Sequence, residues 1–141
     1  MYLLDTNVVS ELRKAPSGRA DANVVSWAAS VAVPMLFISS ITVLEIEIGI
    51  LQIERKDVGQ GALLRSWLEN HVLTAFNGRT IAFDTPTARK CAGLHVPDRK
   101  SDRDAMIAAT ALVHGMHIVT RNTPDFAATG VALINPWNMT V

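Results

Sequence analysis

The stretch from Ser101 to Phe126, SDRDAMIAATALVHGMHIVTRNTPDF, constrains the fold of this chain most strongly. Its alanine-rich pattern predicts a helix from Ser101 to Gly115, and the short apolar run from His117 to Thr120 is typical of a buried strand. Arg121 to Phe126 reads as a turn with Pro124 near the start of a short helix. Strands separated by helices favour parallel pairing, because the helix carries the chain back to the edge of the sheet where it started.

The rest of the chain repeats this alternation of strand and helix. Short apolar runs predict strands at 1–4, 35–39, 80–83 and 131–134, and helical patterns cover 8–13, 23–33, 41–53, 62–76 and 85–94. Residues 54–61, ERKDVGQG, read as a polar connection between two helices that form a hairpin arm, a common site for pairing with a second subunit. The pattern predicts an α/β fold, with about five short parallel strands covered by helices on both faces.

Length and composition limit the class of protein. A chain of 141 residues suits one domain, 1–141, and its 49% hydrophobic residues allow a sizeable core without any run long enough to cross a bilayer. The opening MYLLD lacks the pattern of an export signal, so we expect a cytoplasmic protein with no membrane contact. The single cysteine, Cys91, has no partner for a disulfide or a Cys-based metal site and is expected to be a buried thiol.

Thirteen acidic and thirteen basic side chains cancel, so attraction to nucleic acid has to come from local clusters of charge. One basic cluster lies just before the opening stretch and contains Arg89, Lys90, Arg99, Lys100 and Arg103. This cluster has two interpretations: it contacts phosphates, or it is simply a solvated helix face.

Three acids stand where a structural role is also natural. Asp5 follows the first strand and is a suitable helix cap, and Asp104 lies three residues after Ser101, the spacing of a capping box. Asp102 offers itself as the actual cap, which would leave Asp104 free to point elsewhere. Asp125 follows Asn122 by the same three residues and would stabilise a short helix.

Glu45 is harder to explain as a structural residue. It lies within the apolar helix ITVLEIEIGILQI, where an ionised carboxylate is costly unless it is paired or holds a cation. We expect it in the first turn of that helix, with close approach of a neighbour possible one turn later at Gly49. Glu47 shares the opposite polar edge and is expected to be solvated.

Asp5, Glu45, Asp104 and Asp125 all map to one end of the predicted sheet, beyond the strands' carboxyl ends, where ligands gather in such folds. Carboxylates without nearby His or Cys suit Mg²⁺, for which Mn²⁺ can substitute, and a cation relieves the repulsion between them. None of the four histidines has metal spacing or a triad setting, so they are interpreted as structural or surface residues.

Three segments together resemble the motifs of PIN-domain ribonucleases, specifically VapC-type toxins and their FitB-like relatives. They are LLDTNVVSEL, SSITVLEIEIGI and DRDAMIAATALVHGMHIVTRNTPDF. The resemblance spans nearly the whole chain and implies a three-layer α/β/α sandwich, a homodimer, and metal-binding roles for Asp5 and Asp104. It also implies that Glu45 and Asp125 complete the acidic site, that Thr6, Thr120 and Asn122 line it, and that a small VapB- or FitA-like antitoxin binds the toxin and carries its only link to DNA.

The expected reaction is metal-dependent hydrolysis of an RNA phosphodiester by a toxin that its antitoxin neutralises. Two alternatives remain. The first is a magnesium-binding phosphoacceptor signalling domain, which would need paired acids after its first strand, whereas Asp5 stands alone before Thr6. The second is a non-catalytic partner-binding module in which the acids only cap helices.

Overall fold

Five short parallel strands form the centre of the computed structural model, which describes residues 1–139; residues 140 and 141 of the predicted domain lie outside the described residues. The strands are β1 (Tyr2–Leu4), β2 (Leu36–Ser39), β3 (Thr80–Ile81), β4 (His117–Val119) and β5 (Leu133–Ile134). Their order in the sheet is β3-β2-β1-β4-β5, and every neighbouring pair is parallel. The predicted parallel sheet is confirmed, and β1 occupies its middle.

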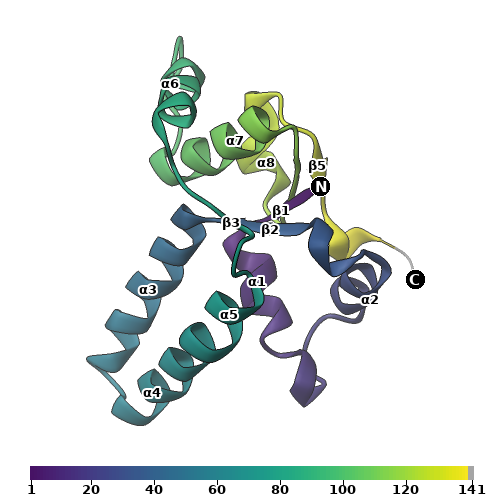
Figure 1. The fold of residues 1–141 in the computed structure, drawn as a ribbon, viewed down its shortest axis with the longest axis vertical. Helices are drawn as coiled ribbons and strands as arrows, with labels where there is room; N and C mark the ends of the chain where they lie inside the picture. The colour runs from purple at the N-terminus through teal and green to yellow at the C-terminus, as the bar shows by residue number, and fades with distance from the viewer. Residues whose placement is uncertain (140–141) are drawn as a thin grey trace.

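Helices cover both faces of this sheet (Figure 1). Alternate side chains of a strand point to opposite faces, so Leu4 and Val119 belong to one apolar core while Leu3 and Ile118 belong to the other. The first core is closed by α1 (Thr6–Leu12), α2 (Ala22–Ser30), α3 (Ser40–Glu54) and α4 (Val58–Trp67), and the second by α7 (Asp102–His114) and α8 (Thr123–Phe126), with α6 (Thr85–Leu94) packed on α7. The α/β/α sandwich is confirmed.

Side-chain caps fix two helix starts within one residue of the positions that the sequence predicts. The Ser39 hydroxyl accepts a hydrogen bond from the Ile41 N–H at 3.0 Å, and Asp84 accepts one from the Thr87 N–H at 3.1 Å. These caps satisfy backbone donors that a helix leaves free at its N-terminus. They place the starts of α3 and α6 directly after strands or extended chain.

Several predicted boundaries are off by one or two residues, and two helix boundaries are wrong by three or more. The helix expected to end at Val33 ends at Ser30, because Val31 is already extended and a 3₁₀ turn, Val33–Met35, contains Pro34. The expected connection 54–61 is shorter than predicted, since Asp57 accepts the Gln60 N–H at 3.0 Å and starts α4 at Val58. A π-helical segment, Leu68–Val72, then joins α4 to α5 (Leu73–Ala75).

Helices α3 and α4 form the predicted hairpin arm, which extends away from the sheet in Figure 1. The two helices pack closely at Gly61, where an added Cβ would lie 2.6 Å from Glu54 Cγ. Arg65 bridges Glu47 and Glu54 across the arm, so Glu47 is ion-paired and the expectation of a merely solvated acid is wrong. Gly49 was expected to allow close approach, but a Cβ there would meet nothing within 4 Å.

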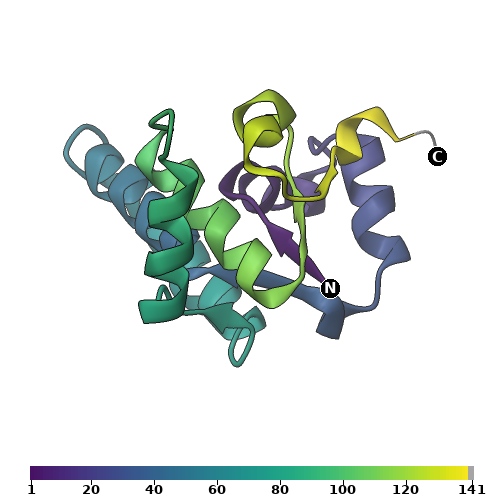
Figure 2. The same ribbon diagram turned by 90° about the horizontal axis from the view of Figure 1, so that it is seen from above.

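The C-terminal end of the described chain returns to α2, as the view in Figure 2 shows. The Asn23 amide donates a hydrogen bond to the Trp137 carbonyl at 2.9 Å. Cys91 is a buried free thiol, as predicted. Over the described residues, no helix is both long enough and apolar enough to cross a membrane.

Candidate metal centre

Four elements bring their acids to the carboxyl edge of the sheet. Asp5 follows β1 directly, Glu45 comes from the helix after β2, and Asp125 lies in α8, just beyond β4. Asp104 lies in the first turn of α7. The charges of Glu45 and Asp104 both act on Asp5, and those of Asp125 and Glu45 act on Asp104, so the fold brings these four side chains into one electrostatic group.

Asp5 is held by three hydrogen bonds in the middle of this group. Its Oδ1 accepts the Thr6 N–H at 2.8 Å, which is the predicted cap of α1. Its Oδ2 accepts the Thr120 hydroxyl at 2.8 Å and the Asn7 side-chain amide at 3.1 Å. Asp5 therefore does more than cap a helix, because it also joins the ends of β1 and β4.

The environment of Asp5 favours its neutral form. Burial raises the pKa of this carboxyl above its ordinary value, the hydrogen bonds from Thr120 and Thr6 oppose the rise, and the charges of Glu45 and Asp104 add to it. The side chain is only 6% exposed. A buried carboxylate with acidic neighbours is the kind of group that a bound cation would keep ionised.

Two side chains, those of Thr6 and Arg103, compensate the charge of the Glu45 carboxylate. The Thr6 hydroxyl donates to Oε1 at 2.7 Å, and the Thr6 oxygen lies 3.3 Å from the buried Thr42 hydroxyl. On the other side, Arg103 Nε lies 3.7 Å from Oε2. Helix α3 begins at Ser40, so Glu45 falls in its second turn and the expected first-turn position is wrong.

Asp104 and Asp102 have different surroundings, although only Arg103 lies between them in the chain. Asp102 is exposed and accepts a hydrogen bond from Arg99 at 3.0 Å, and Ser101 makes no side-chain cap, so no capping box forms. Burial raises the pKa of Asp104, followed by repulsion from Asp125 and Glu45, while Ser101 and Arg103 oppose the rise. Asp104 thus interacts electrostatically with Asp125 and Glu45.

Asp125 and Asn122 stand at the exposed rim of this group. Asp125 is solvent-exposed and acts on Asp104 through its charge. Asn122 precedes α8 without capping it through its side chain, and its backbone N–H donates to the Thr120 hydroxyl at 3.0 Å. Thr120 is fully buried and links this turn to Asp5.

Asn7 was not singled out from the sequence, yet its amide connects the three parts of the site. Its Nδ2 donates to Asp5 and, at 3.2 Å, to the Thr120 hydroxyl, while its Oδ1 accepts the Arg121 N–H at 3.2 Å. The partners lie more than a hundred residues apart, so only its place two residues after Asp5 could have drawn attention to it.

The donor set fits a hard divalent cation, because all four acids offer carboxylate oxygens. Within residues 1–139, however, no three His, Cys, Asp or Glu side chains are close enough to enclose a metal ion. The four acids repel one another electrostatically, and in the described part of the chain they do not form a coordination cage. No histidine belongs to this group.

The predicted basic cluster is divided among separate contacts. Arg99 pairs with Asp102, the Lys100 ammonium donates to the Leu94 and Asp98 carbonyls, and only Arg103 reaches a site acid. The Arg121 guanidinium lies 5.3 Å from the centre of the Trp137 ring.

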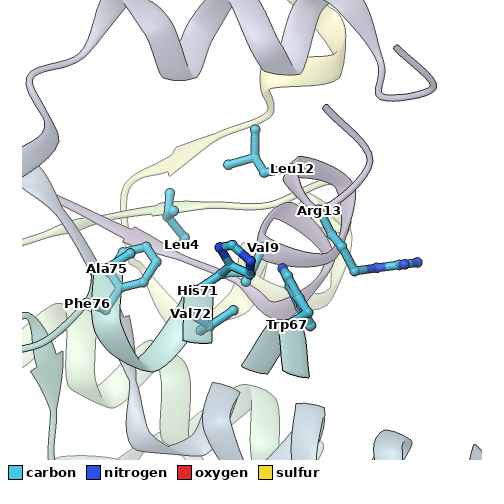
Figure 3. A pocket seen from close by; sticks show the side chains of 9 residues that line it. All are labelled: Leu4, Val9, Leu12, Arg13, Trp67, His71, Val72, Ala75 and Phe76. Atoms are coloured by element: carbon cyan, nitrogen blue, oxygen red, sulfur yellow. The ribbon is translucent and has the colours of Figure 1, made fainter. Parts of the chain in front are cut away.

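Two adjoining cavities lie along the arm, and only the first reaches a site acid, Glu45. The first, about 240 Å³, touches Thr6, Glu45 and Gly49. The second, about 160 Å³ and shown in Figure 3, lies between α1 and the α4 to α5 segment, away from the acids; its lining is mainly apolar and comprises Leu4, Val9, Leu12, Arg13, Trp67, His71, Val72, Ala75 and Phe76. Both share Arg13 and Trp67, and we call them together the arm groove.

A five-stranded parallel sheet between helical layers, with carboxylates gathered at its carboxyl edge, defines an α/β protein with an acidic site suited to a divalent cation. Residues 2–131 match the model of the PIN domain, and the chain therefore belongs to the PIN-domain family.

Similar proteins align with this chain over almost its whole length. The VapC ribonuclease Y4jK of Sinorhizobium fredii is 37% identical over 97% of this chain and 98% of its own length. Toxin FitB of Neisseria gonorrhoeae is 38% identical over 98% of this chain and 99% of its own length. The crystal structure of FitAcB from Neisseria gonorrhoeae covers 99% of this chain and all of its own, with 33% identity and a TM-score of 0.88.

Proposed function

We propose that this protein is a Mg²⁺-dependent endoribonuclease and the toxin of a toxin–antitoxin pair in the cytoplasm. One observation carries the proposal: carboxylates from four separate segments gather at the carboxyl edge, where burial and the charges of neighbouring acids raise the pKa values of Asp5 and Asp104. The names of the similar proteins, a ribonuclease and a toxin, support the same function.

Asp5 and Asp104 would hold the metal, and Glu45 and Asp125 would complete the acidic site. A bound Mg²⁺ would supply Lewis acidity and an activated water for phosphodiester hydrolysis. The chain's own contribution is to fix these acids: Thr120 and Asn7 orient Asp5, and Thr6 orients Glu45. Asn122 positions Thr120 through its backbone N–H.

Conservative substitution of the acids tests this proposal. Asp5→Asn or Asp104→Asn should abolish Mg²⁺-dependent RNA cleavage and cellular toxicity while circular dichroism shows an intact fold. Asp102→Asn is the matched control, because Asp102 turns to Arg99 and should leave cleavage near the wild-type rate. Full cleavage by either of the first two variants would refute the assignment.

The other two functions predict different outcomes. A phosphoacceptor would form a labile aspartyl adduct with acetyl phosphate, although the chain's PIN-domain membership and the single acid after β1 favour the nuclease. In a non-catalytic module, titration with Mn²⁺ would give no stoichiometric binding, because the acids would serve only as caps.

The arm groove is the proposed binding site for an apolar segment of the antitoxin. It is lined by apolar side chains over most of its length and reaches Thr6 and Glu45, so a segment lying in it would end at the acids and block RNA. The antitoxin would also provide the protein's only contact with DNA. Trp67→Ala should weaken inhibition by the antitoxin while leaving the cleavage rate of the free toxin close to wild type.

A further inference from the structure

A single base reaches the acids of the site. Among the ion pairs of residues 1–139, only that of Arg103 with Glu45 involves one of the four site acids. Arg103 also directly precedes Asp104 in the first turn of α7, where its charge opposes the rise in the pKa of Asp104. A guanidinium therefore stands where the proposed function requires a divalent cation and an RNA phosphate.

The contact between Arg103 and Glu45 is loose. Nε lies 3.7 Å from Oε2, against 3.0 Å for the neighbouring pair of Arg99 and Asp102, and the Arg103 side chain is 48% exposed. A half-exposed pair at this distance adds little stability. Because the contact uses Nε, the two terminal nitrogens of Arg103 are not needed for it and remain suited to another anion.

The charges of the site predict that Arg103 leaves Glu45 when a divalent cation binds. A divalent cation among the acids attracts Glu45 and repels the guanidinium, since both effects follow from Coulomb's law over a few ångströms. A guanidinium released from a carboxylate matches a phosphate diester well, because its donors form parallel hydrogen bonds to two oxygens. The other bases near the site have different partners: Lys100 donates to backbone carbonyls, Arg121 lies beside Trp137, and Arg13 lies over the Trp67 ring.

We propose that Arg103 is the counter-cation of Glu45 in the metal-free protein and becomes a phosphate-binding residue when metal and RNA occupy the site. The inference rests on the proposed nuclease function and adds to it a specific residue that exchanges one anion for another. It also means that Arg103 competes with the metal for Glu45.

The test is Arg103→Gln, which removes the charge and keeps much of the side chain's length. Titration calorimetry with Mn²⁺ alone should show binding about threefold to tenfold tighter than in the wild type, because one positive charge near the ion is gone. Cleavage of a 12-nucleotide single-stranded RNA in Mg²⁺ should show KM raised about tenfold, with kcat changed less, because a phosphate contact is lost.

Two further variants control for charge and for loss of an ion pair. Arg103→Lys keeps the charge and should bind Mn²⁺ as the wild type does. Arg99→Gln removes the neighbouring ion pair with Asp102 and should also leave Mn²⁺ affinity unchanged. Thermal unfolding of each variant shows whether the fold is retained, which the exposure of both arginines favours.

The possible failures can be told apart. If the wild type neither binds Mn²⁺ nor cleaves RNA, the proposed function and this inference both fall. If the wild type does both but Arg103→Gln binds Mn²⁺ more weakly, Arg103 only supports Glu45 and the inference alone is wrong. An unchanged KM would also overturn it.

Discussion

The two oxygens of Asp5 face different partners, and this difference determines what the residue can do. Oδ2 accepts hydrogen bonds from Thr120 and Asn7, whereas Oδ1 accepts only the backbone N–H of Thr6. A carboxylate oxygen has room for about two such contacts, so Oδ1 keeps a free position. Capping and metal binding are therefore compatible roles of one side chain.

The first prediction concerns Asn7, which supplies one of those donors. Asn7→Ala should weaken Mn²⁺ binding about tenfold or more, because residues that orient a ligand typically contribute this much to metal affinity. It should also lower the melting temperature, since Asp5 and Thr120 each lose a partner. Calorimetry and thermal unfolding measure both effects. Asn70→Ala, which removes an exposed amide bonded to Ser66, should change neither; equal Mn²⁺ affinity in the two variants would contradict the role of Asn7.

The second prediction follows from the raised pKa of Asp104. Because this pKa lies above its ordinary value in the folded protein, the folded state binds the proton more tightly than the unfolded chain does. The residue's contribution to stability is therefore greatest at low pH and is lost as the pH rises from the ordinary pKa through the raised one. Metal-free Asp104→Asn should melt a few degrees above the wild type at pH 7, and the difference should shrink toward pH 3.5.

Asp84 provides a control of opposite sign. Hydrogen bonds from the Thr87 hydroxyl and N–H lower the pKa of Asp84, so its ionised form stabilises the folded state and Asp84→Asn should melt lower than the wild type at pH 7. Melting curves in EDTA from pH 3.5 to 8 compare the three proteins. A lower melting temperature for Asp104→Asn at pH 7 would show that the repulsion is unimportant.

The acids of the site were accessible to sequence reasoning because each has a position relative to a strand or helix. Asp5 follows an apolar run, and Asp104 begins the segment DAMIAATA, so both could be placed at one edge. The partners of these acids were not accessible. Asn7 contacts Thr120, which lies 113 residues away in the chain, and Arg103 of α7 contacts Glu45 of α3. Local sequence patterns do not encode such contacts.

In the arm, Gly61 sets the distance between α3 and α4. A Cβ on Gly61 would lie 2.8 Å from Glu54 Cα, a backbone atom that cannot move without shifting α3. This contact lets Arg65 of α4 pair with both Glu47 and Glu54 of α3. The arm is thus held by close backbone packing and by charge.

The third prediction compares two glycines of the arm. Gly61→Ala should lower the free energy of unfolding by about 1–3 kcal/mol, as overpacking typically does. Gly49→Ala is the matched control: a Cβ there meets nothing within 4 Å, so the better helix propensity of alanine should raise stability by up to about 1 kcal/mol. Urea unfolding of both variants measures the difference, and a neutral Gly61→Ala would contradict the close contact.

Element types were easier to predict from the sequence than element ends. Ser39 and Asp84 are strong caps, and the helices after them begin within one residue of the expected positions. The start of α4 was missed because Asp57 lies in a run of polar residues that resembles a loop. The roles of Gly49 and Gly61 were missed because the spacing of two helices depends on their crossing, which periodicity does not report.

One apolar strip on the arm has no cover within the described chain. Leu44 and Leu51 of α3 are 45% and 52% exposed, and the half-buried Ile48 lies between them. The spacing of four and three residues puts these side chains on one side of α3, the geometry of a helix-pairing seam. We propose that a second copy of the chain packs here, which gives the expected homodimer a specific surface.

The last prediction tests that surface. Leu44→Glu should convert a dimer into a monomer, because a second copy would have to bury two carboxylates, one from each subunit, against apolar side chains. Light scattering after size-exclusion chromatography measures the mass directly. Val113→Glu places the same charge on α7 at a site that is 40% exposed and should leave the dimer intact. Because the acids at the sheet edge belong to one chain, monomeric Leu44→Glu should still bind Mn²⁺, and a dimeric variant would place the interface elsewhere.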